Sequence, residues 1–288
     1  MKNSLLSLGL ALLSLSVWAQ APNLNNSTKP KPVERPQDGY FKKSNVINAK
    51  VIPYAPVREA DIIFSKRIWR EIDLRDPLNK PLIAPKSRLV DVILDAVMAG
   101  ELTAYDPTPT KEDIGGDEFS KVLTAKEAYA QFVDSVLVPK FDADGNQISA
   151  EMKAGEFNPD SILKFRIKED WIFDKQRSVF EPRIIGIAPM VRKQAAGESF
   201  EDQPAFWIYF PEVRHILVTR PVVNSRNDAT SLTFDDVFMK RIFASYIVKE
   251  SNDQDLRIKD YAQGIDRLYE SERIKKALLD WEHDLWSY

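Results

Sequence analysis

The spacing of apolar side chains first predicts a helix over residues 61–76. Phe64, Ile68 and Ile72 recur every four residues, so they would form one apolar stripe along a helix, with cationic residues on its other sides. Pro77 disfavours a helical conformation at the residue before it. We therefore expect this helix to end at about residue 76.

The same periodicity predicts a second helix over residues 87–99, which Gly100 follows as a C-terminal stop. A third helix is expected to begin after Thr124, because Thr124 and Glu127 have the spacing of a capping box. Apolar residues at helical spacing extend this third helix to about residue 136.

The middle of the chain changes to the pattern of strands. Residues 163–168 alternate apolar with cationic side chains, which predicts a half-buried strand with one face in water. Further strands are expected near residues 179–187 and 205–210. Residues 205–210 contain only apolar and aromatic side chains, so we expect this strand to be central, with both faces covered.

Asp142 begins a segment that superficially resembles a calcium-binding loop. An EF-hand loop needs Gly at its sixth position and Glu at its twelfth, but here Gly145 is fourth and Lys153 is twelfth. The acidic, glycine-containing segment lies between the short apolar runs 136–141 and 148–152. It therefore favours the turn of a β-hairpin over a metal site.

The last third of the chain predicts helices again. Thr233 and Asp236 form a second capping box, and the helix that follows is expected to reach about residue 249. Two more helices are expected, over residues 254–269 and after Ser271. Helices segregated from strands predict an α+β fold, with an antiparallel sheet in the middle, helices before and after it, and an extended Pro-rich arm in front.

Two pairs of segments resemble each other within the chain. Residues 61–69 align with residues 235–243, and residues 88–95 align with residues 273–280. One hypothesis is a duplicated helix pair. The alternative is that amphipathic helices look alike, and the unequal spacing of the two pairs favours it.

The N-terminal segment is typical of a secretory signal peptide. Lys2 precedes an apolar stretch over residues 5–15 that is too short to span a bilayer, and cleavage is expected after Ala19. The chain contains no cysteine, so it lacks both disulfides and the residue that anchors a bacterial lipoprotein. We therefore expect residues 1–19 to be a signal peptide and the exported protein to be periplasmic.

An extended Pro-rich arm is expected over residues 20–57, ahead of one α+β domain over residues 58–288. A disordered linker is one interpretation of the arm. Its second half is more apolar than a free linker needs, so we expect it to lie along a surface of its own domain or of a neighbour. The candidate contact residues are Val46, Ile47, Val51, Ile52 and Tyr54.

Composition excludes several classes of function. The net charge of −3 argues against general nucleic-acid binding, which needs a strong basic field. Glycine occurs only 10 times and no GxGxxG or P-loop pattern is present, so a phosphate cradle is not expected. No stretch after residue 19 is apolar and long enough to predict a membrane span.

The candidate chemistry is also sparse. The two histidines are His215 and His283, which gives no support for a catalytic triad. Glu282, His283 and Asp284 are neighbours on a predicted helix and point about 100° apart, so they cannot chelate one ion together. Paired carboxylates for glycan cleavage stay open, because the chain has 43 acidic residues. We predict no catalytic, metal or cofactor residue.

Several long strings resemble the GldN/PorN proteins of gliding bacteria. They are residues 69–75, 207–214, 234–252 and 270–286, and the likeness extends from about residue 57 to residue 288. The resemblance implies a periplasmic part of the type IX secretion system, which also supports gliding motility. It implies a ring formed with an outer-membrane lipoprotein of the GldK/PorK type, contact with a shaft protein of the GldM/PorM type, and no enzymatic activity.

We therefore expect a scaffolding subunit that stays at the outer membrane through its partner. Arg214 and Arg241, which lie in or near the resembling strings, are expected to support interfaces; the alternative is a salt bridge within their own domain. Two other functions remain as alternatives. One is a periplasmic glycan hydrolase with two carboxylates in a deep cleft, and the other is a carrier or chaperone for exported proteins with a large apolar groove.

Overall fold

The computed structural model describes most of the chain after the first part of the arm. The described residues are 44–111, 113–133, 135–141, 147–154, 157–195, 198–223, 227, 229 and 231–286. The expected signal peptide over residues 1–19 and the arm up to residue 43 lie outside them. Residues 43–288 group into one unit.

The strands are β1 (Ile62–Asp73), β2 (Ala104–Tyr105), β3 (Val122–Leu123), β4 (Ser135–Phe141), β5 (Gln147–Ala154), β6 (Lys164–Asp174), β7 (Val179–Ala195), β8 (Glu198–Pro204), β9 (Trp207–Tyr209) and β10 (Tyr246–Glu250). The helices are α1 (Ser44–Ile47), α2 (Leu89–Met98), α3 (Ala125–Ala130), α4 (Phe210–Leu217), α5 (Phe234–Met239), α6 (Ile258–Tyr261) and α7 (Asp266–Trp286). Short 3₁₀ helices cover Glu59–Asp61, Lys80–Ile83 and Pro159–Ser161.

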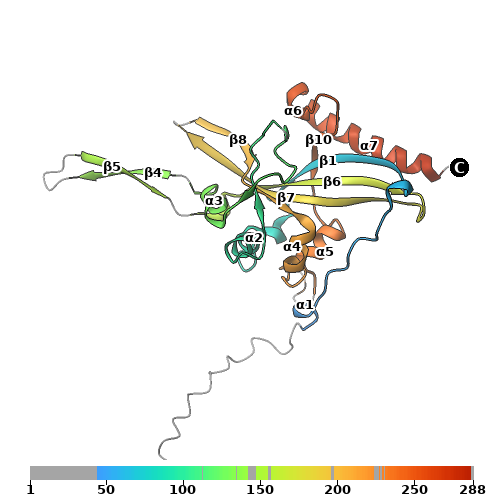
Figure 1. The fold of residues 1–288 in the computed structure, drawn as a ribbon, viewed down its shortest axis with the longest axis horizontal. Helices are drawn as coiled ribbons and strands as arrows, with labels where there is room; N and C mark the ends of the chain where they lie inside the picture. The colour runs from blue at the N-terminus through green and yellow to red at the C-terminus, as the bar shows by residue number, and fades with distance from the viewer. Residues whose placement is uncertain are drawn as a thin grey trace, which may run out of the picture. The chain divides into compact units, whose positions relative to one another are not determined.

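One antiparallel sheet organises the described residues. Its strand order is β10-β1-β6-β7-β9-β2-β3, and β8 pairs with the last part of β7 (Figure 1). The strands β4 and β5 pair only with each other, which confirms the predicted hairpin, while its turn at residues 142–146 lies outside the described residues. An antiparallel sheet with helices before and after it confirms the predicted α+β fold class.

The predicted helix over residues 61–76 is wrong, because this segment is the long strand β1. It pairs with β6 on one side and with β10 on the other. A four-residue repeat is a multiple of the two-residue period of a strand, so Phe64, Ile68 and Ile72 share a face in either structure. The two neighbouring strands decided which structure formed, and nothing in the spacing distinguishes them.

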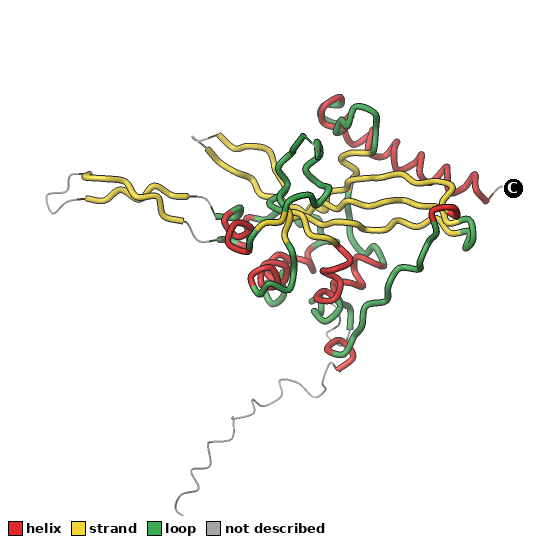
Figure 2. The backbone as a smooth tube through the Cα atoms, in the orientation of Figure 1, coloured by secondary structure: helices red, strands yellow, loops and turns green. Residues whose placement is uncertain are grey.

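One face of the sheet is covered by helices and holds the main apolar core. The helices α2, α4 and α5 lie together on this face (Figure 2). The largest fully buried side chains of the protein include Phe165, Ile167 and Ile187 from the sheet and Ile93, Phe210 and Phe238 from the helices. A smaller core lies where α7 runs beside β10 and the first half of β1, with Phe64 stacked on Trp281 at 4.8 Å between ring centroids.

The opposite face of β6 does not point into water as predicted. Arg166 is buried, and Lys168 is only 2% exposed. The loop over residues 106–121 covers this part of the sheet, and carboxylates neutralise both cations. The alternation at residues 165–168 therefore separates an apolar core from a buried polar layer, not from solvent.

Both capping boxes are confirmed, but the helices that they begin are shorter than predicted. Thr124 and Glu127 cap α3, and Thr233 and Asp236 cap α5. The helix α5 ends at Met239 and Arg241 follows with φ of +54°, a left-handed conformation that stops the helix. The strands β4 and β10 take the residues where the sequence predicted further helical turns.

The hypothesis of a duplicated helix pair is wrong. Residues 61–69 lie mainly in a strand, whereas residues 235–243 contain α5, so the two similar strings fold differently. The C-terminal helices are also divided differently from the prediction. The helix α6 has a single turn, and α7 begins at Asp266, inside the segment that the sequence assigned to the preceding helix.

Candidate functional site

The described end of the arm is fixed to the domain by Tyr54. The Ile184 amide donates a hydrogen bond of 3.3 Å to the Tyr54 hydroxyl, and the Arg183 guanidinium donates one of 2.8 Å to the Ala55 carbonyl. The guanidinium groups of Arg183 and Arg214 lie 5.3 and 5.2 Å from the centre of the Tyr54 ring. Cation–π contacts and backbone hydrogen bonds therefore hold this part of the arm against β7 and α4.

Arg214 connects the arm to the helical layer. Its guanidinium makes a bidentate pair with Asp235 of α5, with distances of 2.7 and 3.1 Å, and both side chains are buried. Burial also raises the pKa of the Tyr54 hydroxyl, so the ring stays neutral between the two arginines. Two residues predicted for interfaces, Tyr54 and Arg214, thus meet within one chain.

The other apolar arm residues divide into two groups. Val46 is 2% exposed and Val51 is partly buried, whereas Ile47 is 70% exposed and Ile52 is 79% exposed. The arm is therefore anchored to its own domain while two isoleucine side chains face outward. Outward aliphatic side chains on an anchored segment are available to another surface.

Arg241 also has partners within its own domain. Its guanidinium makes hydrogen bonds of 2.8 and 3.3 Å to the fully buried Glu169 carboxylate and lies 5.6 Å from the Trp171 ring centre. Arg70 approaches the same carboxylate at 3.6 Å. These contacts, like those of Arg214, are the salt bridges of the alternative interpretation, and a role at an interface stays a prediction.

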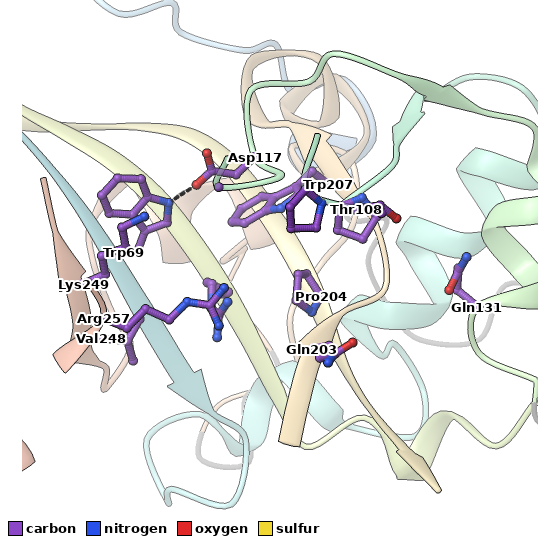
Figure 3. Close-up of a pocket in the computed structure, with 14 residues that line it drawn as sticks. Trp69, Thr108, Asp117, Gln131, Gln203, Pro204, Trp207, Val248, Lys249 and Arg257 are labelled. Carbon is purple, nitrogen blue, oxygen red and sulfur yellow. Dashed lines mark hydrogen bonds between the residues drawn. The ribbon is translucent and has the colours of Figure 1, made fainter. Parts of the chain in front are cut away.

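A cavity of about 260 Å³ opens on the sheet face opposite α2, α4 and α5. Trp69 and Trp207 line it, together with Pro107, Pro204 and Arg257 (Figure 3). Its polar wall is Asp117, whose carboxylate accepts a hydrogen bond from the Trp69 indole and one of 3.0 Å from the Lys168 ammonium. No sequence pattern predicts this cavity, because its walls come from segments that are far apart in the chain.

The loop over residues 106–121 is shaped by specific residues. Gly116 has φ of +65°, and a Cβ atom there would lie 2.1 Å from the Pro107 carbonyl oxygen. The Asp113 carboxylate accepts hydrogen bonds from the amides of Asp117 and Glu118 at 3.2 and 2.9 Å. Only glycine fits this close approach, so Gly116 is a sequence signal of this loop conformation.

A second cavity, of about 380 Å³, shares Arg166, Val248 and Arg257 with the first. Burial alone would raise the pKa of Glu71, but the cations Arg166 and Lys164 and the Tyr246 hydroxyl hold it below its usual value. A glycan hydrolase needs a carboxylic acid with a raised pKa. The carboxylate here has the opposite shift, so this cavity does not support the hydrolase.

Another of the three carboxylates that line this cavity behaves in the same way. Burial would raise the pKa of Asp202, but hydrogen bonds and charge from Arg192 and Lys164 lower it. The described residues contain no cluster of His, Asp or Glu that could hold a metal ion. None of the described helices combines the length and the apolar character that crossing a membrane requires.

These features define an α+β protein whose polar cavities place carboxylates beside cations, an arrangement suited to binding. A comparison with families of known proteins places it more closely. The chain belongs to the GldN family, gliding motility associated protein GldN, whose family model matches residues 57–287. It is thus a protein associated with gliding motility and type IX secretion, in a family of structural components and not of known enzymes. A comparison with curated proteins gives no match.

Proposed function

We propose that this protein is a structural subunit of the periplasmic ring of the type IX secretion system. In this proposal it assembles with itself and with an outer-membrane lipoprotein of the GldK/PorK type, and it contacts a shaft protein of the GldM/PorM type. Membership of the GldN family supports this function. The signal peptide expected over residues 1–19 and the lack of a lipid-anchoring cysteine support a periplasmic protein that a partner holds at the membrane.

The arm is the proposed contact between ring neighbours. A closed ring of identical subunits needs two different faces on each subunit. Tyr54 holds one end of the described arm to its own domain, so Ile47 and Ile52 are presented outward at a short distance along the chain from a fixed point. Burying an aliphatic side chain of this size contributes about 1.5–3 kcal/mol, enough for two of them to affect assembly.

The test is the size of the assembly that a tagged mature chain retains from solubilised envelopes. Wild-type protein is expected in a megadalton assembly that contains one lipoprotein. The double variant Ile47→Asp/Ile52→Asp is expected to shift most of the protein to small species while its melting temperature stays unchanged, because both side chains already face water. Ile114→Asp is the matched control, since Ile114 is 75% exposed elsewhere on the molecule.

Two outcomes would contradict the proposal at different levels. If deletion of residues 20–56 still gave normal assembly, the arm would not be the contact between neighbours. If the wild-type chain were recovered alone as a monomer of roughly 30 kDa, the proposal that this protein is a ring subunit would be wrong. The carrier or chaperone would then be tested next, by searching for exported proteins that the monomer binds.

A further inference from the structure

Arg257 is a cation that the protein leaves without an ion pair among its described residues. It immediately precedes α6 and lines both cavities on the polar face of the sheet. Its guanidinium points into the first cavity (Figure 3). Arginine at such a position offers several donors in a planar fork that matches a carboxylate.

The walls of the two cavities have a cationic surplus. Their described lining residues include seven cations and four carboxylates, on a chain whose net charge is −3. The cations are Lys164, Arg166, Arg192, Lys249, Arg257, Lys259 and Arg267, and the carboxylates are Glu71, Asp117, Glu201 and Asp202. Cations therefore outnumber carboxylates on the walls of these two cavities, although the chain as a whole is net acidic.

None of the four carboxylates forms an ion pair with Arg257, although the positive charge of Arg257 contributes to lowering the pKa of Glu201. Asp117 accepts from Trp69 and Lys168, as described above. Glu71 pairs with Arg166 at 2.6 Å, Asp202 pairs with Lys164 at 3.0 Å and with Arg192 at 2.8 Å, and Glu201 pairs with Lys259. The Arg257 guanidinium therefore has donors available for a carboxylate from a bound partner.

The apolar part of the walls indicates what accompanies that acceptor. Trp69, Trp207 and three prolines (Pro107, Pro109 and Pro204) line the first cavity. The strand β10 bulges at Val248, because Trp69 pairs with Lys249 while the next residue of β1 pairs with Ile247, and Val248 lies on the wall of both cavities. Aromatic and proline surfaces beside a cation suit an extended peptide that carries both an acidic and an apolar side chain.

We propose that the two joined cavities bind an acidic peptide segment of a partner protein. A carboxylate of the peptide pairs with Arg257, and a neighbouring apolar side chain packs on Pro107 and Pro204, which line the first cavity and are partly exposed. The volumes of about 260 and 380 Å³ exceed what one small anion needs and approach the usual range for ligand sites.

The arm of this chain is not the occupant. Residues 20–43 contain five cationic and two acidic side chains, so their charge has the same sign as that of the cavity walls. The proposed peptide site therefore does not depend on the arm or on ring assembly, and it can be tested on the isolated mature chain.

The probe is a pool of capped hexapeptides that contain two Glu residues beside Leu, Phe or Pro, with a matched pool in which Gln replaces Glu. The readout is the indole N–H resonances of Trp69 and Trp207 in a ¹H–¹⁵N NMR spectrum, assigned through Trp→Phe variants. The acidic pool is expected to shift both resonances at submillimolar concentration and to leave that of Trp281 unchanged. The Gln pool is expected to shift none of them.

Two variants make the test specific. Arg257→Glu is expected to weaken binding of the acidic pool at least tenfold, because it reverses the charge. Arg257→Gln is expected to weaken binding less, because it only removes the charge. Arg220→Glu is the matched control, because Arg220 is exposed and lines neither cavity. The melting temperature of each variant checks that the fold is retained.

Three results would overturn the proposal. The first is an equal response to the acidic and Gln pools. The second is no shift of either indole resonance with the acidic pool. The third is the same shift, at the same concentration, with succinate alone, which would mean a site for small anions and not for peptides.

Discussion

The two faces of the main sheet solve the same packing problem by different chemistry. On β6, Phe165 and Ile167 enter an apolar core under the helices, whereas Arg166 and Lys168 enter a buried layer of ion pairs on the other side. Adjacent residues of one strand therefore have opposite chemistry and nearly equal burial. Burial alone therefore does not identify the apolar core of this protein.

The two faces should respond differently to substitution. Apolar packing is non-directional and depends on volume, so loss of a side chain leaves a cavity. A buried ion pair depends on its partner, so removing one member leaves an unpaired charge, while removing both can be nearly neutral.

Phe165→Ala is expected to have the largest effect on stability. The side chain is fully buried in the helix-covered face, and truncation of a buried phenylalanine costs about 3–5 kcal/mol. The measurement is the free energy of unfolding from urea titration. Phe165→Leu is the control, with a smaller loss expected, and equal losses for Leu and Ala would show that cavity volume does not decide the effect.

Lys168→Met is expected to cost about 3 kcal/mol, because it leaves the buried Asp117 carboxylate without its cation. The double variant Lys168→Met/Asp117→Asn should recover at least half of this loss, which a double-mutant cycle in urea measures. Strictly additive losses in the double variant would mean that the polar layer contributes through packing, like the other face.

The stability of the polar face should depend on pH through Glu71. Its pKa is lowered in the folded protein, so the unfolded chain takes up the proton first as the pH falls. This contribution is full above the ordinary glutamate pKa of about 4.3 and is lost as the pH falls through the lower folded pKa. Between pH 7 and pH 3, the free energy of unfolding should therefore fall less in Glu71→Gln than in the wild-type protein. Identical pH profiles would contradict this role.

Arg192→Ala is expected to have the smallest effect. Arg192 pairs with Asp202 at 2.8 Å, but its side chain is about half exposed, and exposed pairs contribute about 0–1 kcal/mol. Urea titration at low and high salt should show a small loss that salt abolishes. A loss as large as that of Lys168→Met would mean that the polar layer extends to the rim of the cavity.

Local signals predicted local structure well. The hydroxyl of Thr124 or Thr233 and the carboxylate three residues later bond to backbone amides within one turn, so the start of each helix is encoded in four residues. The ends of the same helices were not predicted, because Arg241 adopts a left-handed conformation after α5 and because β4 and β10 form where further helical turns were expected. The repeat at Phe64, Ile68 and Ile72 fits both a helix and a strand, so only strand pairing could decide it.

The candidate sites divide in the same way. The apolar excess of the arm marked Tyr54 as a contact residue, but its actual partners, Arg183 and Arg214, come from β7 and α4. The cavity had no sequence signal beyond Gly116 and the prolines of its loop. Trp69 and Asp117 are far apart in the chain, and no spacing rule relates them.

The sequence by itself determined the α+β class, the capped helix starts, the hairpin and the family, because these depend on short-range patterns or on long matching strings. The tertiary structure alone decided that residues 62–73 are a strand, that the cations of β6 are buried, and that Arg257 faces a cavity. The physical reason is that strand pairing and charge neutralisation join residues distant in sequence, so their free energy is not encoded in any local window.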